Sequence, residues 1–272
     1  PDVDMASFTG STAVGRRVME LAALHGDAAF VPQCGLAPGL IGIVGSSIAA
    51  GFDQIRSIEL KVGALPQNPT GLLGYAFNWS AEGVVNEYLN DCEVLRSGRR
   101  QMVPAMDEKE RVFIGGIELE AALTSGGLGT MCQTYEGRVQ RLDYKTLRYP
   151  GHFRQMHFLF DELGLRDCRD EVGRILVKAK PPVNDDIVYL HAAVEGIKDG
   201  QPFRENHVRG YLPLTIPEGD SEGRTWRAIS WTFSSRNTGL GMRAKLENSS
   251  TIRRRSPTWR TIVPVSRSKV SL

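Results

Sequence analysis

The stretch IRSIELKVG, from Ile55 to Gly63, decides the fold, because its alternation of apolar and polar residues predicts a strand with one covered face. The next periodic segment, AEGVVNEYLNDCE at residues 81–93, has helical spacing and predicts a helix that Ser80 caps. The apolar stripe of that helix consists of Val84, Val85, Tyr88 and Leu89. A strand followed by a helix indicates a fold that mixes the two.

The same pattern continues along the chain in both directions. Helices are predicted over residues 16–24, 40–50 and 152–163, the last of them ending at Gly164. Strands are predicted over residues 28–32, 138–148, 187–197 and 203–212. The tripeptide Lys198-Asp199-Gly200 predicts a hairpin between the last two strands, and a polar, charged connection is expected from Arg96 to Arg111. Together these elements predict an α+β fold with a mixed sheet.

The composition argues against several classes of protein. No run of about 18 apolar residues exists, and the chain starts without a basic segment that leads into an apolar one. We therefore expect neither a membrane span nor a signal peptide, and the predicted compartment is the cytoplasm. The cysteines form no C-x-x-C pair, which argues against a zinc site and against a disulfide framework. We expect no metal.

The net charge of +2 hides a segregation along the chain. Residues 233–272 contain nine Lys or Arg and one acid, a local net charge of +8 that leaves −6 on the rest. The basic segment lacks a recognisable reading helix or aromatic stacking pattern, so nucleic-acid binding is not expected. This segment also offers too little apolar surface to offset the entropy lost on ordering. It is predicted to be a disordered tail.

Four stretches of the chain carry a family resemblance. They are VPQCGLAPGLIG (31–42), ELKVGALPQNPTGLLGYAFNWSAEGVVNEY (59–88), LTSGGLGTMCQTYEGRVQRLDYKTLRYPGH (123–152) and GRTWRAISW (223–231). In order and spacing they resemble the substrate-binding part of the saccharopine dehydrogenase family, which includes lysine 6-dehydrogenase-like enzymes. The resemblance extends from about residue 27 to residue 231.

The resemblance implies a fold, a reaction and partners. The fold is an α+β substrate domain with a mixed sheet, which the family attaches to a Rossmann domain. Such enzymes move a hydride between a C–N bond of an amino-acid substrate and NAD or NADP. The implied function is therefore an oxidoreductase of a lysine-derived amino acid. The implied partners are that small-molecule substrate and a second copy in a homodimer, with no membrane.

Arg148 is the first candidate for substrate binding under this resemblance. Its planar guanidinium can hold a carboxylate through two hydrogen bonds and stays charged. A surface ion pair is the alternative role for Arg148. His152 lies beside it across a Pro-Gly turn and is the candidate catalytic proton acceptor, titrating near neutral pH. The alternative is a solvated histidine in the first turn of a helix.

Further site residues are implied by analogy with the family. Asn78 and Trp79 would line the substrate pocket, one with amide hydrogen bonds and the other with an apolar face. Trp79 could equally be a core aromatic residue. Gly35, Pro38 and Gly39 would shape the floor near the cofactor, where only a small backbone can approach.

The chain departs from the family at both ends. No G-x-G-x-x-G fingerprint precedes the family segment, and no predicted helix follows the glycine run at residues 126–129. Most of the Rossmann domain is therefore expected to be absent, and the chain alone is expected to bind NAD or NADP weakly or not at all. A truncated, fused or frame-shifted gene is our hypothesis for these departures.

The first residues have a different resemblance. SFTGSTAVGRR, at residues 7–17, has the glycine spacing of a phosphate-binding loop but lacks its Lys. Residues 1–26 resemble a nucleotide-domain segment of aldehyde dehydrogenases, although the cysteine and glutamate segments needed for aldehyde oxidation are absent. The predicted organisation is this fragment, a substrate domain at 27–232 and the basic tail at 233–272. A non-catalytic module for amino-acid binding or dimerisation is the alternative function.

Overall fold

The computed structural model describes residue 20 and residues 33–212, 230–233 and 242–245. It divides into two compact units, residues 21–213 and residues 1–20 with 214–272. In the second unit, β9 (Ser230–Phe233) pairs with β10 (Met242–Lys245) in antiparallel fashion. The strand expected at 28–32, nearly all of the segment 1–26 and most of the predicted tail lie outside the described residues. None of the helices that the structure describes is both long and apolar enough to cross a membrane.

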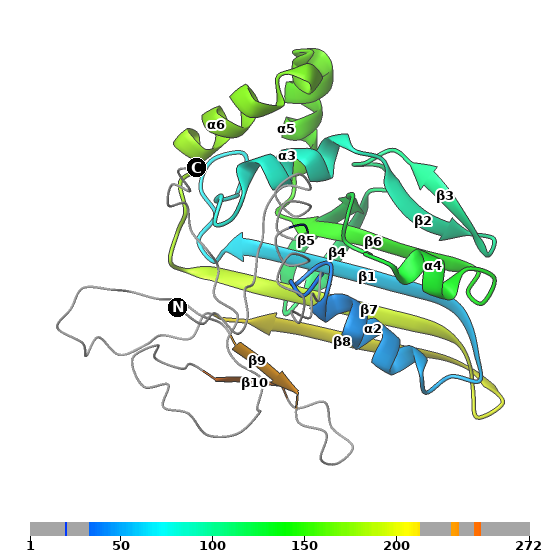
Figure 1. Ribbon diagram of the computed structural model, residues 1–272. Coiled ribbons are helices and arrows are strands. Elements are labelled where there is room, and N and C mark those ends of the chain that lie inside the picture. Colours follow the sequence, from blue (N-terminus) through cyan, green and yellow to red (C-terminus); the bar gives the residue numbers. More distant parts are fainter. Residues whose placement is uncertain (1–19, 21–32, 213–229, 234–241, 246–272) are drawn as a thin grey trace. The chain divides into compact units, whose positions relative to one another are not determined.

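Residues 33–212 form a mixed sheet with helices, as the sequence predicted (Figure 1). The strands are β1 (Gln54–Pro66), β2 (Cys92–Arg96), β3 (Arg99–Val103), β4 (Glu110–Ile114), β5 (Ile117–Leu123), β6 (Arg141–Arg148), β7 (Asp186–Lys198) and β8 (Gln201–Tyr211). The order is β3-β2-β6-β1-β7-β8, with β5 also pairing with β6 and β4 with β5. β1 and β6 run parallel, and every other pair in this sheet is antiparallel.

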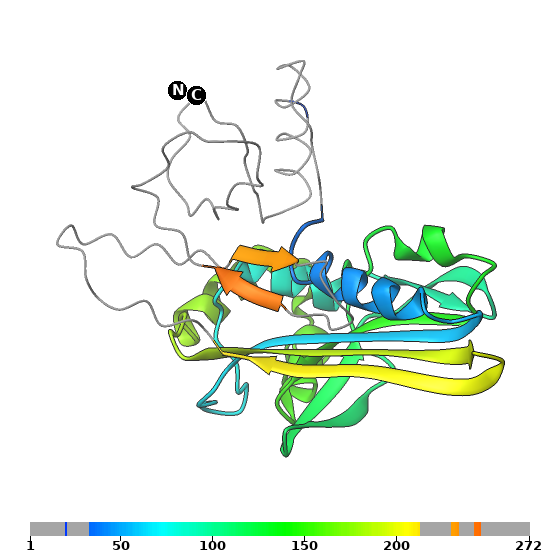
Figure 2. The ribbon, with the colours of Figure 1, turned by 90° about the horizontal axis from the view of Figure 1, so that it is seen from below.

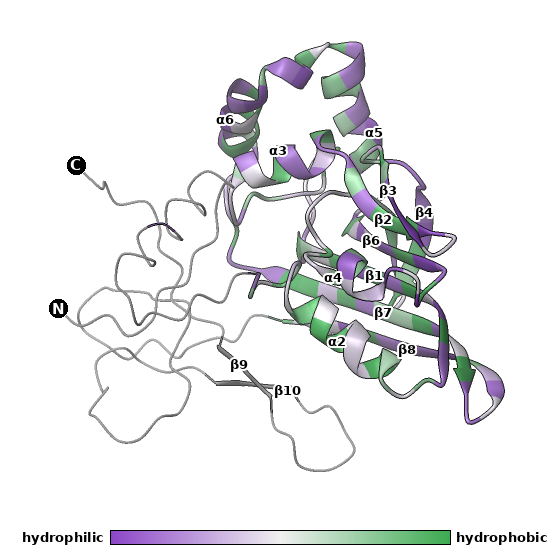
Figure 3. Ribbon diagram, turned by 45° about the vertical axis from the view of Figure 1, so that its right-hand side comes forward, coloured by the Kyte–Doolittle hydropathy of each residue, from purple (hydrophilic) through white to green (hydrophobic). Residues whose placement is uncertain are grey.

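The parallel pair at the centre is buried on both faces, which corrects the expectation of one covered face for residues 55–63. On one face, α2 (Leu40–Ala49) packs on Ile58 and Leu60. The helix can approach this closely because residue 45 is glycine: a Cβ at that position would lie only 2.6 Å from a Leu60 methyl carbon. Figure 2 shows α2 lying along the strands. In Figure 3 the hydrophobic colour follows α2 and the strands beneath it.

The other face of the central strands is charged. Lys61 of β1 and Lys145 of β6 are opposite each other in register, and both are buried. Glu110 of β4 lies 3.3 Å from the Lys61 ammonium and 3.0 Å from that of Lys145. Since β4 also contacts β8 at the far end of the sheet, the sheet is curled around these charges. Burial, and then the positive charge of Lys61, lower the pKa of His191 on this face to about 4.

A second layer is helical and covers one end of the sheet. It consists of α3 (Ala81–Leu89), α5 (His152–His157), a π-helical turn (Phe158–Glu162) and α6 (Arg169–Ala179). Ser80 caps α3 as predicted, its hydroxyl accepting a 3.1 Å hydrogen bond from the Gly83 amide. Val84, Val85 and Tyr88 form the buried stripe. No helix was predicted from the sequence at the position of α6.

The predictions for one connection and for one helix end need correction, and the predicted hairpin is confirmed. The segment from Arg96 to Arg111 is not a polar connection, because it holds β3 and parts of β2 and β4, short strands whose exposed charges hide the periodicity. The helix expected to reach residue 93 ends at Leu89, where the chain turns into β2. The hairpin is confirmed: Asp199 and Gly200 have φ of 52° and 73° between the paired residues Lys198 and Gln201.

Replacing Gly63 by Ala should destabilise the fold at the β1–β6 contact. An added Cβ would lie 2.7 Å from the Leu147 Cβ and 2.8 Å from its carbonyl oxygen, so the strands must separate. We expect the free energy of unfolding to fall by about 1–3 kcal/mol in urea denaturation. The matched control is Gly173→Ala in α6, where the nearest atom is 3.8 Å away and stability should hold or rise slightly. Equal effects of the two substitutions would contradict the close contact.

Candidate functional site

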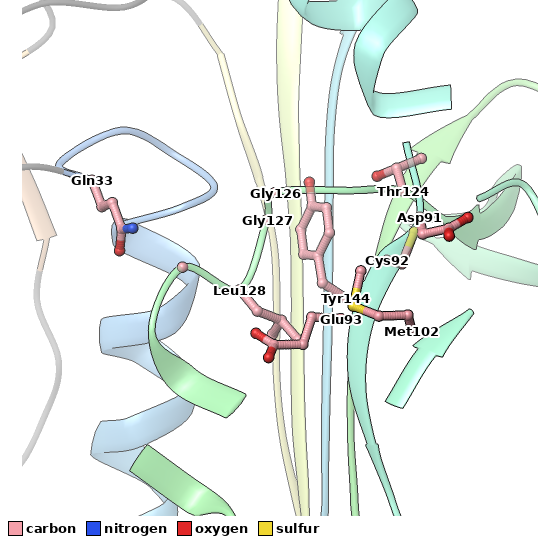
Figure 4. A pocket seen from close by; sticks show the side chains of 11 residues that line it. Gln33, Asp91, Cys92, Glu93, Met102, Thr124, Gly126, Gly127, Leu128 and Tyr144 are labelled. Atoms are coloured by element: carbon pink, nitrogen blue, oxygen red, sulfur yellow. The ribbon is translucent and has the colours of Figure 1, made fainter. Parts of the chain in front are cut away.

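A pocket of about 240 Å³ opens beside the glycine loop at residues 126–129, over the Tyr144 side chain of β6 (Figure 4). Gly127 lies against the Tyr144 ring, where a Cβ would come within 2.1 Å of a ring carbon. Gly129 has a φ of +56° and lies against the Gln33 side chain, which also lines the pocket. These two positions require glycine, so the glycine run shapes a wall of the pocket.

The charged groups that line the pocket are acidic. Asp91 and Glu93 flank the buried Cys92 where the chain leaves α3 and enters β2, and Met102 of β3 lies beside them. No Lys or Arg is among the residues that line this cavity. Burial raises the pKa of the Cys92 thiol to about 12, so this cysteine is not a reactive thiolate at neutral pH. Of the two carboxylates, that of Glu93 also lies 3.5 Å from Nη1 of Arg100, which is outside the lining.

The predicted cofactor residues form the turn that starts α2. The Gly35 amide donates to the Pro38 carbonyl at 2.9 Å, and the Leu40 amide donates to the Gly35 carbonyl at 2.8 Å. Gly39 has a φ of 135°, and a Cβ there would lie 2.3 Å from the Gly35 oxygen. The turn does not line the pocket itself. Pro38 packs near Gly129, so the turn supports the glycine loop.

The described residues lack the arrangement that an NAD(P) pyrophosphate requires. Such a site needs a glycine loop between a parallel strand and a helix whose first amides are free. The glycine loop instead follows β5, which pairs only in antiparallel fashion, and precedes the short α4 (Met131–Tyr135). The first amides of α2 already donate to the turn, at Gly35 and Leu36. Residues 33–212 therefore do not fit the dinucleotide.

Arg148 is buried, not on the surface, and two of its guanidinium nitrogens donate hydrogen bonds within the protein. Its Nε donates to the Tyr88 hydroxyl at 2.8 Å, and its Nη1 donates to the Leu147 carbonyl at 2.9 Å. The guanidinium stacks over the Tyr75 ring, 4.5 Å from its centroid. Its Nη2 lies 3.9 Å from a Glu87 carboxylate oxygen. Direct contact between Arg148 and a substrate stays a prediction.

His152 is also buried, with both ring nitrogens engaged. The Leu73 carbonyl can only accept, so Nδ1 donates to it at 2.8 Å. In the neutral ring Nε2 then accepts from the Tyr88 hydroxyl at 2.9 Å, which leaves the Tyr88 oxygen to accept from Arg148. Burial, and then the charge of Arg148, lower the pKa of His152 to about 3.

Two sequence expectations about His152 are therefore wrong. The ring does not titrate near neutral pH, and it is not a solvated histidine, since it is 1% exposed. The physical reason is the turn at Pro150-Gly151, which directs the first residue of α5 into the core instead of toward solvent. A catalytic role for His152 stays an untested prediction.

Asn78 and Trp79 lie before α3 and contact the chain itself. The Asn78 amide donates to the Val183 carbonyl at 3.2 Å and accepts from the Val183 amide at 2.8 Å. The Trp79 indole donates to the Tyr75 hydroxyl at 3.1 Å and packs against the core, which matches its alternative role as a core aromatic. Neither residue is among those that line the pocket. Their contact with substrate stays a prediction.

The residues that build the pocket were not predicted from the sequence. The glycine run was considered only as a nucleotide loop, and Tyr144, Asp91 and Glu93 were not among the candidate site residues. One signal was available: Asp91 and Glu93 lie on either side of Cys92, directly after the predicted helix stripe. Within the part of the chain that the structure describes, no three His, Cys, Asp or Glu side chains cluster as metal ligands would.

The neutral, buried His152 should make the protein sensitive to acid. Its folded pKa of about 3 lies below the usual unfolded value of about 6.5, so the unfolded chain takes up a proton first as pH falls. Its contribution to stability is complete above pH 6.5 and is lost between pH 6.5 and 3, by up to about 1.4 kcal/mol per pH unit. Urea denaturation at pH 7 and 4.5 should show a smaller acid loss for His152→Gln than for the wild type. An equal loss would contradict the assignment.

The comparisons with known proteins agree with this architecture. A family model described as the saccharopine dehydrogenase C-terminal domain matches residues 35–235. The apo saccharopine dehydrogenase (L-Glu forming) from Saccharomyces cerevisiae has a similar solved structure, with a TM-score of 0.50 at 15% identity over 65% of this chain. The match spans 58% of the yeast chain, and at this identity it shows the fold alone. Since the family model covers most of the chain, the protein belongs to the saccharopine dehydrogenase C-terminal domain family.

Proposed function

We propose that residues 33–212 supply the substrate pocket of an oxidoreductase of amino-acid metabolism, of the saccharopine dehydrogenase type. The family depends in general on NAD(P), and the dinucleotide would be held by residues other than these. The observation that carries the proposal is the acidic pocket formed by the glycine loop, Tyr144, Asp91 and Glu93. Its chemistry suits the amino group of a lysine-derived substrate.

The pocket lining supports a specific orientation of that substrate. An ammonium would lie near Asp91 and Glu93, where charge-assisted hydrogen bonds to carboxylates are strong. The methylene chain would lie along Met102, which is 61% exposed, and Leu128, two apolar side chains of the same lining. In this chain the task of these residues is to bind and orient the amine, while other groups hold the dinucleotide in line with it.

This assignment places the substrate in the pocket and not on Arg148, which is not among the lining residues. The guanidinium is 2% exposed and already donates to Tyr88 and Leu147. A substrate carboxylate could reach it only if side chains around it moved. The earlier expectations for Arg148, Asn78 and Trp79 as direct contacts therefore compete with the pocket. Binding data on variants of both regions decide between them.

Several wider expectations remain proposals of the same kind. They comprise the homodimer, the cytoplasmic compartment, the choice between NAD and NADP, and the aldehyde dehydrogenase-like nature of residues 1–26. The alternative function, a non-catalytic module that binds amino acids, uses the same pocket. Turnover with a dinucleotide separates the two functions.

Removing a pocket carboxylate should weaken substrate binding. Glu93→Gln should lower the affinity for L-lysine in isothermal titration calorimetry at least about tenfold, the effect of losing a hydrogen bond to an ionised group. Glu118→Gln is the matched control, because Glu118 pairs with Arg111 on a hairpin away from the lining and should leave the affinity unchanged. Arg148→Ala, measured in parallel, tests the competing site. A loss of L-lysine affinity in Arg148→Ala alone would indicate that the substrate binds at Arg148 and not in the pocket.

The full chain should bind NAD(H) or NADP(H) weakly or not at all. The reason is the poor fit of residues 33–212 to a pyrophosphate, whose affinity depends on free amides at a glycine-rich helix start. Titration followed by nicotinamide fluorescence measures this directly. Tight binding, with turnover of L-lysine or saccharopine, would overturn the expectation and show that other residues supply the nucleotide site.

A further inference from the structure

The hydroxyl groups of Thr124, Thr146 and Tyr144 form a buried row, which we call the hydroxyl trio. Tyr144 and Thr146 are two residues apart on β6 and therefore lie on one face of the sheet. Thr124 directly follows β5, the strand that pairs with this part of β6. The Thr146 hydroxyl oxygen lies 2.5 Å from that of Thr124 and 3.5 Å from that of Tyr144. All three residues are at most 5% exposed.

Both ends of the hydroxyl trio belong to the pocket. Thr124 and Tyr144 line the cavity, as does Asp91, whereas the middle residue of the trio does not. In Figure 4 the Tyr144 hydroxyl points toward the end of the pocket where Thr124 and Asp91 lie. The packing agrees, because Leu123 and Cys92, the neighbours of Thr124 and Asp91 along the chain, contact each other in one apolar cluster. A ligand in the pocket can therefore meet a hydroxyl and a carboxylate at the same end.

The hydroxyl trio keeps one proton for the pocket. Three hydroxyls carry three protons, and the two contacts within the trio use two of them. If Thr124 donates to Thr146 and Thr146 to Tyr144, the Tyr144 O–H is left; in the reverse direction the Thr124 O–H is left. Within residues 33–212 neither end has a further side-chain hydrogen bond. Burial raises the pKa of Tyr144, so the phenol keeps its proton at neutral pH.

The long contact points to Tyr144 as the freer end. At 3.5 Å its oxygen is beyond the usual O–H···O distance, whereas Thr124 is held at 2.5 Å. A buried donor without a full partner is costly, and a ligand acceptor at this position would remove that cost. The pocket thus offers a neutral O–H donor in a lining whose charged groups are both acids.

We propose that the Tyr144 and Thr124 hydroxyls recognise a carboxylate oxygen of the substrate and thereby select an α-amino acid over a simple amine. A carboxylate alone would be repelled by Asp91 and Glu93. An α-amino acid carries an ammonium and a carboxylate on one carbon, so its ammonium can meet an acid of the lining while its carboxylate accepts the remaining O–H. The inference rests on the proposed function, because it needs an amino acid in the pocket.

Calorimetry on the full chain with L-lysine and 1,5-diaminopentane tests the inference. Both ligands have two amino groups on the same carbon chain, and only L-lysine has a carboxylate. The double variant Tyr144→Phe/Thr124→Val removes both ends of the trio. Its ratio of L-lysine to 1,5-diaminopentane affinity should be about tenfold lower than in the wild type, the effect of one hydrogen bond to an ionised group. Each single variant leaves one donor and should lower the ratio less.

The matched control is Tyr135→Phe/Thr134→Val in α4. It makes the same two changes at residues outside the lining, where the Thr134 hydroxyl donates to the Thr130 carbonyl. The affinity ratio should stay at the wild-type value. A fall equal to that of the pocket variant would show that the change in ratio does not come from the hydroxyl trio.

A second measurement avoids substitution, in case the double variant fails to fold. The ζ carbon of Tyr144, which carries the hydroxyl, can be followed by NMR in the wild type. Its resonance should shift when L-lysine is added and shift less with 1,5-diaminopentane. Equal shifts with the two ligands, or an unchanged affinity ratio in the folded double variant, overturn the role of the hydroxyls alone. Failure of the wild type to bind L-lysine or saccharopine overturns the proposed function as well.

Discussion

The parallel pairing of β1 with β6 is the constraint on which the rest of the structure depends. Alternate residues of a strand face opposite sides, so the register of this pair decides what each side of the sheet receives. Leu60 pairs with Tyr144 on the side that α2 covers, whereas Lys61 pairs with Lys145 on the side that curls around Glu110. A shift of β6 by one residue along β1 would move Lys145 to the side that α2 covers and Tyr144 to the charged side. The pocket floor and the charged interior are thus two results of one register.

Much of the fold was predictable because its elements keep one clear period. The α2 and α3 segments, the long strands and the turn at Asp199-Gly200 have strong local signals, and the structure confirms them. The strands β3 and β4 were not predicted, because five-residue strands with charged, exposed side chains resemble a polar loop. Burial of β1 on both faces also escaped prediction, since Glu59 and Lys61 looked solvent-facing while they pair within the curled sheet.

The candidate site was less predictable, because its chemistry depends on three-dimensional neighbours. Arg148 was identified from the sequence, but its environment of Tyr75, Tyr88 and Glu87 converts it from a surface fork into an enclosed cation. Burial, and then the charge of the same cation, keep His152 neutral. A glycine run can serve a nucleotide, a turn or a pocket wall, and only the Tyr144 ring beneath Gly127 distinguishes the last. Resemblance located the region correctly. The tasks that it implies for individual residues stay predictions.

The hydrogen-bonded tyrosines around Arg148 have a consequence at the opposite end of the pH scale. Burial raises the pKa of Tyr75, Tyr88 and Tyr144, so these phenols keep their protons in the folded chain where an unfolded chain would lose them, above about pH 10. Alkali therefore pulls the equilibrium toward the unfolded state as pH rises past that value. Phenolate absorbance from these three rings would arise together with loss of the core, which makes them an internal optical reporter of its opening.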